Sequence, residues 1–321
     1  MKKIKQIVTI FATLALAVTA GLSFAGTKTK AAGSDEFTRT AIEIAADMGY
    51  GWNLGNTMEA TNTWTSNPKV TDFETAWGQP VTTKSMIDGI KKAGFNSIRI
   101  PVSWSNMMSS DGNYTIDASY FKRVDEIISY AFANDMYVII NDHYDGGWWE
   151  HFCGNKRDCM KHYKNMWTQV AGHYKDYSEK LIFESANEEL GDSLKKSLSK
   201  IDVNISDTAL YNLVNEINQT FVDIVRQSGG NNARRYLLIA GFNTDIDKTC
   251  SSLYEMPADT ISNHLMVSVH YYTPWTYVGL YKDEGYGYKA TWGTDSDKSE
   301  MAWNFAKMKK FTDAGYGVVI G

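Results

Sequence analysis

Short apolar segments rich in β-branched residues alternate with longer amphipathic segments along the chain after about residue 36. The segments that predict strands are 50–54, 97–102, 137–141, 181–185, 235–240, 265–269 and 317–320. The segments that predict helices are 83–93, 118–133, 160–177, 209–227 and 298–312. Thr83 is placed to cap the first of these helices, and Gly94, Gly229 and Gly315 stand where helices end.

The alternation predicts the fold class. Strands that are separated by helices pair in parallel, and seven such strands without a low-complexity linker indicate one domain over 36–321. We predict a (β/α)8 barrel, the TIM barrel, in preference to an open doubly wound sheet. No glycine-rich phosphate loop follows any predicted strand, which weakens a nucleotide-binding function.

The first 32 residues have the pattern of a secretory signal. Lys2, Lys3 and Lys5 precede an apolar run over 7–20, which is too short for a comfortable membrane span, and small residues follow it. We expect 1–32 to be a signal peptide with a short leader, and the protein to be secreted and free of the membrane after cleavage. Nothing downstream approaches about 18 consecutive apolar residues.

Composition and charge limit the classes of molecule that the protein can bind. The formal charge of the 321 residues is −5, and the first 32 residues hold five lysines and no acid, so the rest of the chain stands at −10. Such a body repels phosphate backbones, which argues against nucleic acid and favours a neutral substrate. Cys153 and Cys159 lie six residues apart; a small disulfide and free thiols both remain open, with Cys250 left over.

Polar residues share one parity at the ends of four apolar strands, so in a barrel they point inward. They are Ser97, Arg99 and Pro101; Asn141, His143 and Asp145; and Ser268, His270 and Tyr272. The fourth strand ends in the polar run 184–189, which closes with Asn187-Glu188-Glu189. A buried Arg99 is costly without a partner, so we expect it to pair with a carboxylate. These groups converge at the carboxyl ends of the strands, where barrel enzymes hold their chemistry.

Five runs together resemble glycoside hydrolase family 5, the retaining cellulase family. The runs are GWNLGNT at 51–57, FNSIRIP at 95–101, INDH at 140–143, NE at 187–188 and HYY at 270–272. The resemblance covers about residues 40–321 in the right order. It is strongest to the branch of secreted bacterial endo-β-1,4-glucanases that includes lichenases and xyloglucanases.

The resemblance implies a role for each matching residue. It makes Glu188 the general acid/base, gives Asn187 to the sugar 2-hydroxyl and Arg99 to orienting the nucleophile, and places Asn53 against the substrate. His143, His270 and Tyr272 would complete the shell. Two positions depart from many relatives, which carry His where this chain has Tyr144 and Pro where it has Glu189.

Retaining hydrolysis needs two carboxylates roughly 5 to 5.5 Å apart, and Glu188 supplies one. We expect the pKa of Glu188 to be raised by an anionic nucleophile and by partial burial, and Arg99 and Tyr272 to keep the nucleophile ionised. The family places that glutamate directly after a run like 318–321, so we expect the nucleophile, the eighth strand and a Trp after Gly321. On this interpretation the chain is C-terminally truncated, inactive and poorly stable.

Aromatic side chains are abundant, with 10 Trp and 19 Tyr. Trp148, Trp149 and Trp275 lie near the proposed catalytic groups, and we expect them to stack on sugar rings. The predicted function is an endo-β-1,4-glucanase acting as a monomer without cofactor or metal. The alternatives are another family 5 specificity (xyloglucan, mixed-linkage glucan or mannan), a non-catalytic glycan-binding barrel, and a metal-dependent hydrolase using Asp142, His143 and Asp145.

Overall fold

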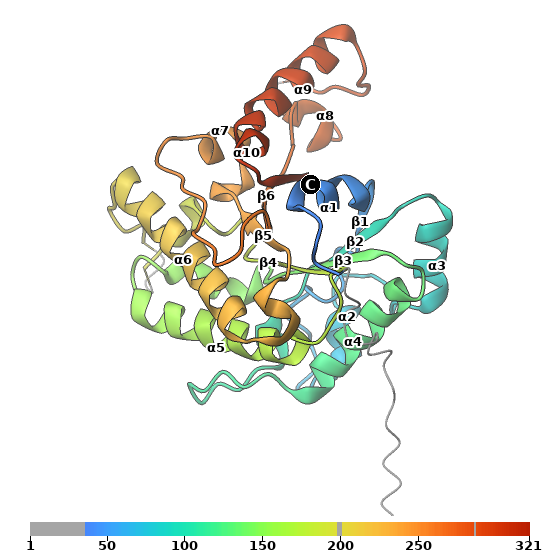
Figure 1. The fold of residues 1–321 in the computed structure, drawn as a ribbon, viewed down its shortest axis with the longest axis vertical. Coiled ribbons are helices and arrows are strands. Elements are labelled where there is room, and N and C mark those ends of the chain that lie inside the picture. Colours follow the sequence, from blue (N-terminus) through green and yellow to red (C-terminus); the bar gives the residue numbers. More distant parts are fainter. Residues whose placement is uncertain (1–35, 198–200, 286) are drawn as a thin grey trace, which may run out of the picture.

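The computed structural model describes residues 36–197, 201–285 and 287–321, so the predicted signal and leader at 1–32 lie outside the described residues. The described part forms one sheet of seven parallel strands, each paired with the next in chain order. The strands are β1 (Gly51–Asn53), β2 (Ser97–Ile100), β3 (Tyr137–Ile140), β4 (Leu181–Glu184), β5 (Leu237–Ala240), β6 (Leu265–Val269) and β7 (Gly317–Ile320). All seven predicted strands are present. The sheet curls into seven strands of an incomplete (β/α)8 barrel, as predicted (Figure 1).

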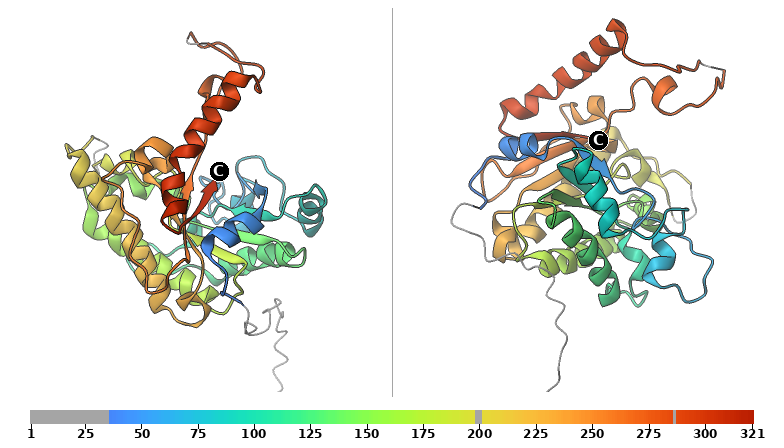
Figure 2. Two further views of the ribbon diagram at one scale, coloured as in Figure 1. Left: turned by 45° about the horizontal axis from the view of Figure 1, so that its top comes forward. Right: turned by 90° about the vertical axis from the view of Figure 1, so that its right-hand side faces the viewer.

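Long helices cover the outer face of the sheet (Figures 1 and 2). They are α3 (Lys84–Lys92), α4 (Ala118–Phe132), α5 (Lys156–Tyr174) and α6 (Asp207–Gln227). Trp167 and Tyr174 recur on one face of α5 and pack on Phe183 of β4, while Phe221 of α6 meets Trp167 edge-on. Side chains at helical spacing therefore build the layer between helices and sheet.

The predicted helix 298–312 is two helices, α9 (Asp295–Lys307) and α10 (Lys309–Asp313), which meet at the buried Met308. Four short helices were not predicted: α1 (Ala41–Met48), α2 (Val70–Glu74), α7 (Ile246–Thr249) and α8 (Trp275–Val278). Five 3₁₀ turns were not predicted either: η1 (Trp104–Met107), η2 (Asp145–His151), η3 (Asp192–Lys195), η4 (Gly230–Ala233) and η5 (Phe242–Thr244).

Helix α1 closes the amino-terminal end of the sheet. A capping box between Thr40 and Glu43 begins it. Its buried residues join the inward-facing residues of β3 to β6 in a second core, whose members are Phe37, Ala41, Ile44, Met48, Tyr137, Ile139, Ile182, Tyr236, Leu238 and Met266. The approach of α1 to β7 is close, because a Cβ at Gly317 would come within 2.6 Å of the carbonyl of Ala41. The mouth at the opposite end is left for polar groups.

The connection from β6 to β7 carries α8 and then α9, which extends away from the body (Figures 1 and 2). Within α9 only Asp297 and Asn304 are buried, so this helix contributes little to the core. Cys153, Cys159 and Cys250 are free thiols, which decides the open question about a disulfide. No helix in the described ranges is both long and apolar enough to cross a bilayer.

Candidate active site

Strands β4 and β6 bring three of the predicted catalytic residues into contact. Glu188 follows β4, and its Oε1 lies 2.7 Å from Nδ1 of His270 and accepts a 2.6 Å hydrogen bond from the hydroxyl of Tyr272. His270 follows β6 and is held by a hydrogen bond from its backbone N–H to the carbonyl of Thr244. The Glu188 side chain remains 42% exposed, so a ligand in the mouth can reach it.

The charge state of Glu188 differs from the expectation. The hydrogen bonds from His270 and then Tyr272 lower the pKa of Glu188 to about 2, against the opposing effect of burial. The prediction of a raised pKa rested on a neighbouring anion and on partial burial. It is wrong for this structure, where two hydrogen-bond donors facing the carboxylate outweigh burial. Burial and the ionised Glu188 together raise the pKa of Tyr272 to about 12, so the phenol keeps its proton.

Arg99 on β2 lies below this cluster and is paired as predicted. Its Nε donates to Oε2 of Glu184 at 2.6 Å, and Glu184 is completely buried. Ser268 donates to the other oxygen of Glu184 at 2.9 Å. The remaining donors of Arg99 reach Asn187 Oδ1 at 3.0 Å and Asn53 Oδ1 at 3.3 Å. The pair therefore fixes both amide side chains that the sequence analysis assigned to the substrate.

Glu184 was not predicted as part of the site. The sequence pattern indicated it, because Glu184 lies two residues after Ile182 in β4 and therefore faces the same side of the sheet. The strand register places Glu184 level with Leu238, which belongs to the inner core as Ile182 does. A carboxylate at that level is the partner that a buried arginine requires.

His143 follows β3, where its backbone N–H donates to the carbonyl of Val102 at 3.0 Å. Its Nδ1 lies 3.4 Å from Nδ2 of Asn141. Burial, and then the positive charge of Arg99, lower the pKa of His143 to about 3, so the imidazole is neutral at ordinary pH. A neutral ring can both donate and accept a hydrogen bond toward a sugar hydroxyl.

The three tryptophans that were predicted to contact substrate differ in how deeply they are buried. Trp149 is fully buried and donates from Nε1 to Asp142 Oδ2 at 2.8 Å, so the prediction that it contacts substrate is wrong. Gly146 and Gly147, both in the left-handed region, turn η2 inward and carry Trp149 with it. Trp148 is half-buried and stacks on Trp149, whereas Trp275 stays exposed beside Tyr272.

Glu189 lies beside the predicted site residues, although no role was predicted for it. Its Oε1 accepts a 3.0 Å hydrogen bond from the backbone N–H of Tyr144, and its Oε2 is buried with no partner. Burial raises the pKa of Glu189 to about 7. The neighbouring carboxyls at 188 and 189 are therefore shifted in opposite directions. Their signal in the sequence was a second acid directly after the Asn-Glu pair at a strand end.

The metal-dependent alternative finds little support in the geometry. Among the described residues, no group of three or more His, Cys, Asp or Glu is arranged to hold a metal ion. Asp142 accepts from Trp149, and Asp145 accepts from Trp148 Nε1 at 2.6 Å and from the backbone N–H of Ser105 at 2.6 Å. These carboxylates already serve the fold.

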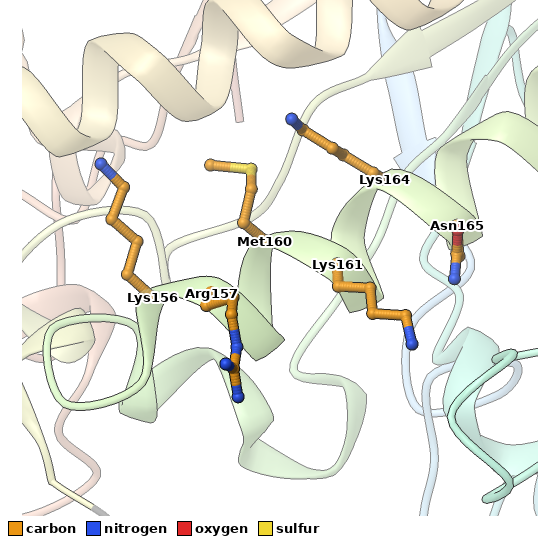
Figure 3. A pocket seen from close by; sticks show the side chains of 6 residues that line it. All are labelled: Lys156, Arg157, Met160, Lys161, Lys164 and Asn165. Carbon is orange, nitrogen blue, oxygen red and sulfur yellow. The ribbon is translucent and has the colours of Figure 1, made fainter.

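A shallow hollow on the outer face of α5 is separate from the mouth (Figure 3). Its lining residues are Lys156, Arg157, Met160, Lys161, Lys164 and Asn165. The side chains spread apart around the helix rather than converging on one point (Figure 3), and none of them is a predicted site residue. We assign it no role.

Known proteins match both the sequence and the fold of this chain. The family model of cellulase, glycosyl hydrolase family 5, matches residues 58–321. Endoglucanase A of Paenibacillus barcinonensis is 38% identical over 334 residues, which cover 96% of this chain and 79% of the relative. Endoglucanase B of Clostridium cellulovorans is 36% identical over 283 residues, which cover 88% of this chain and 60% of the relative.

The solved structures give the same match. The complex of a family 5 lichenase from Caldicellulosiruptor sp. F32 with cellotetraose superposes with a TM-score of 0.78 at 35% identity, covering 91% of this chain and 79% of that one. The chain thus spans between 60% and 79% of the length of these relatives.

Proposed function

Because the chain belongs to the cellulase family, glycosyl hydrolase family 5, we propose that its barrel mouth hydrolyses β-1,4-glucan by a retaining, two-carboxylate mechanism. One observation carries the proposal: Glu188 stands half-exposed in the mouth, held by His270 and Tyr272, beside an Asn187 that Arg99 fixes. That arrangement presents one carboxyl group and an amide to the same sugar, which is what protonation of a glycosidic oxygen and recognition of a neighbouring hydroxyl require.

Glu188 has to act in two protonation states. It donates a proton to the leaving oxygen in the first step and removes one from water in the second. Its lowered pKa in this structure keeps it ionised, which is the charge state that the second role begins from. A second carboxylate in the mouth would repel the charge on Glu188 and compete for the proton of Tyr272, and both effects raise the pKa of Glu188 toward the first role.

We propose that the second carboxylate of the mechanism reaches the mouth from the end of β7, beside His270. Gly321 donates from its N–H to Val269 at 2.8 Å and accepts from the N–H of Tyr271 at 2.9 Å, so the sheet pairing carries it to the level of the mouth. A Cβ on Gly321 would lie 2.9 Å from the His270 ring. The end of β7 therefore lies beside the imidazole that binds Glu188.

The test compares reducing-sugar release by chain 1–321 with release by a chain extended at Gly321 by glutamate and one further strand with its helices, roughly 40 to 60 residues in all. We expect reducing-sugar release only from the extended chain, and none when its added glutamate is glutamine. Activity of 1–321 above a Glu188→Ala control would place the nucleophile within the chain instead.

The preferred polymer is the second part of the proposal. Cellulose, mixed-linkage glucan, xyloglucan and mannan share the β-1,4 linkage, and the loops around the mouth decide among them. We propose β-1,4-glucan because the sequence relatives reported above are endoglucanases. Initial rates of the extended chain on the four polymers test this, and a rate on mannan above that on every glucan would contradict it.

We also propose that residues 1–32 direct secretion and are then removed. The support is the lysine-rich start and short apolar run of the sequence. Expression in a bacterial host with and without 1–32, followed by N-terminal sequencing of the medium fraction, tests this. Equal amounts in the medium from both chains would contradict it.

A further inference from the structure

Two exposed aromatic rings from separate connections meet at the edge of the mouth. Trp77 precedes α3, and Tyr144 directly follows His143 at the end of β3. Their ring centroids lie 6.3 Å apart with an interplanar angle of 57°. Trp77 is 42% exposed and Tyr144 is 40% exposed, although burying such rings is favourable. Two connections therefore hold apolar surface in water next to the proposed catalytic shell.

The backbone that presents Tyr144 is strained. Tyr144 has φ 56° and ψ −53°, and the N–H of Asp145 donates to the carbonyl of His143, which closes a tight γ-type turn. Asp145 also lies in the left-handed region, with φ 49°. A bulky side chain there costs of order 1 to 3 kcal/mol and persists only where surrounding contacts hold it.

Glu189 supplies one of those contacts at a cost of its own. Its Oε1 accepts from the N–H of Tyr144, and the amide of Asn187 lies 3.5 Å from the same oxygen. Its other oxygen is buried without a partner, and no ion pair to Glu189 is present in the described part of the chain. A buried carboxyl without a cation destabilises the fold, so its retention points to a task outside stability.

We propose that Trp77 and Tyr144 form an aromatic wall that stacks on a sugar ring of the bound glucan away from the scissile bond, and that Glu189 is the positioning residue that holds this wall. The proposal rests on the proposed function, because it extends the same glucan along the mouth. Pyranose faces carry C–H groups that pack on aromatic rings, and the wall continues directly from His143 of the proposed site.

The test measures binding, which does not need the nucleophile. Chain 1–321 is titrated with cellotriose and cellohexaose by calorimetry, and the ratio of the two affinities reports contacts made by the extra sugars. Trp77→Ala and Tyr144→Gly should each weaken cellohexaose roughly threefold to tenfold. Glycine is chosen at 144 because it tolerates the left-handed turn, so loss of the ring is separated from loss of the fold.

Trp303→Ala is the matched control. Trp303 is 64% exposed on α9, where it packs with Lys307, and it belongs to no proposed site. Its substitution should leave both affinities unchanged. The double variant of Trp77 and Tyr144 should lose less than the product of the two single losses, because the rings act as one wall.

Positioning by Glu189 is tested separately. Glu189→Gln keeps an oxygen for the N–H of Tyr144 and should retain cellohexaose affinity, whereas Glu189→Ala should weaken it as much as Tyr144→Gly does. In the Tyr144→Gly background, Glu189→Ala should have no further effect on affinity. A structural role alone would lower the melting temperature without this dependence on Tyr144.

The outcomes separate the two proposals. If wild-type chain binds cellohexaose and all the wall variants bind it equally well, the wall is overturned and the proposed function stands. If wild-type chain with a cooperative melting transition binds neither oligosaccharide, the proposed function and the wall are both overturned.

Discussion

The two ends of the sheet treat buried polar groups in opposite ways. At the amino-terminal end, Arg235 is completely buried and uses all five of its N–H groups. They reach Asn232 Oδ1 at 2.5 Å and the carbonyls of Ser178, Leu181, Tyr174 and Tyr177 at 2.9, 2.6, 3.0 and 2.8 Å. No donor of this arginine is left for a ligand.

The mouth leaves hydrogen-bonding capacity unused. Oε2 of Glu189 and Oδ1 of Asp142 are buried without partners, and Glu188 is open to solvent. Tyr144 adds a strained backbone at the same end. The comparison teaches that the saturated end supplies rigidity, while the end with unused capacity is where a substrate and a mobile proton find partners.

The largest expected effect is a loss of turnover when the mouth loses the carboxylate of Glu188. In the extended chain, Glu188→Ala should lower turnover of β-glucan by about 10²–10⁴-fold, since the residue acts as acid and then as base. Substrates with good leaving groups should still be attacked, and added azide should restore turnover with a glycosyl azide of retained configuration. An azide product of inverted configuration would assign Glu188 another role.

The next largest expected effect is a loss of stability when Arg235 at the amino-terminal end of the sheet is replaced. Arg235→Leu removes five buried hydrogen bonds, although the carbonyls of Tyr174, Tyr177 and Ser178 each keep another donor. It should lower the free energy of unfolding by about 3–5 kcal/mol. Urea denaturation measures it. Arg157→Leu is the matched control, because Arg157 is exposed on α5, and it should change the free energy by less than about 0.5 kcal/mol. Equal midpoints for the two variants would contradict the prediction.

A substitution at Glu189 tests whether this buried carboxyl in the mouth lowers the free energy of unfolding. Its pKa is raised to about 7 in the folded protein, above the ordinary 4.5, so its ionisation destabilises the fold as the pH rises from 4.5 through 7. Glu189→Gln should therefore increase the free energy of unfolding at pH 8 by roughly 1 to 3 kcal/mol and change it little at pH 4. A variant less stable than wild type at pH 8 would show that the charge is compensated.

The smallest effect sharpens the contrast between the two adjacent carboxyls. The pKa of Glu188 is lowered to about 2, so its stabilisation is present above its ordinary 4.5 and is lost as the pH falls toward 2. Glu188→Gln should lower the melting temperature slightly at pH 6, and less at pH 3. The effect is small because solvent screens a carboxylate that is 42% exposed. A larger difference at pH 3 than at pH 6 would reverse the assigned shift.

Much of the site followed from local pattern. Side chains in a strand alternate between two faces, and parallel strands end at the same edge, so parity pointed Arg99, His143 and His270 toward one mouth, while the family resemblance pointed to Glu188. The same rule applied to β4 would have found Glu184 opposite Arg99. What failed was the direction of Trp149 in η2, well beyond the end of β3, where that alternation no longer applies.

Sequence alone determined the seven strands, the helices that cover them and the order in which polar residues reach the mouth, because each depends on the spacing of neighbours along the chain. Only the tertiary structure decided that Trp149 points inward, that α1 closes the sheet and that Glu188 is ionised while Glu189 holds its proton up to about pH 7. A pKa sums burial and charges from residues far apart in the chain, such as His270 for Glu188, and those distances exist only once the strands are paired.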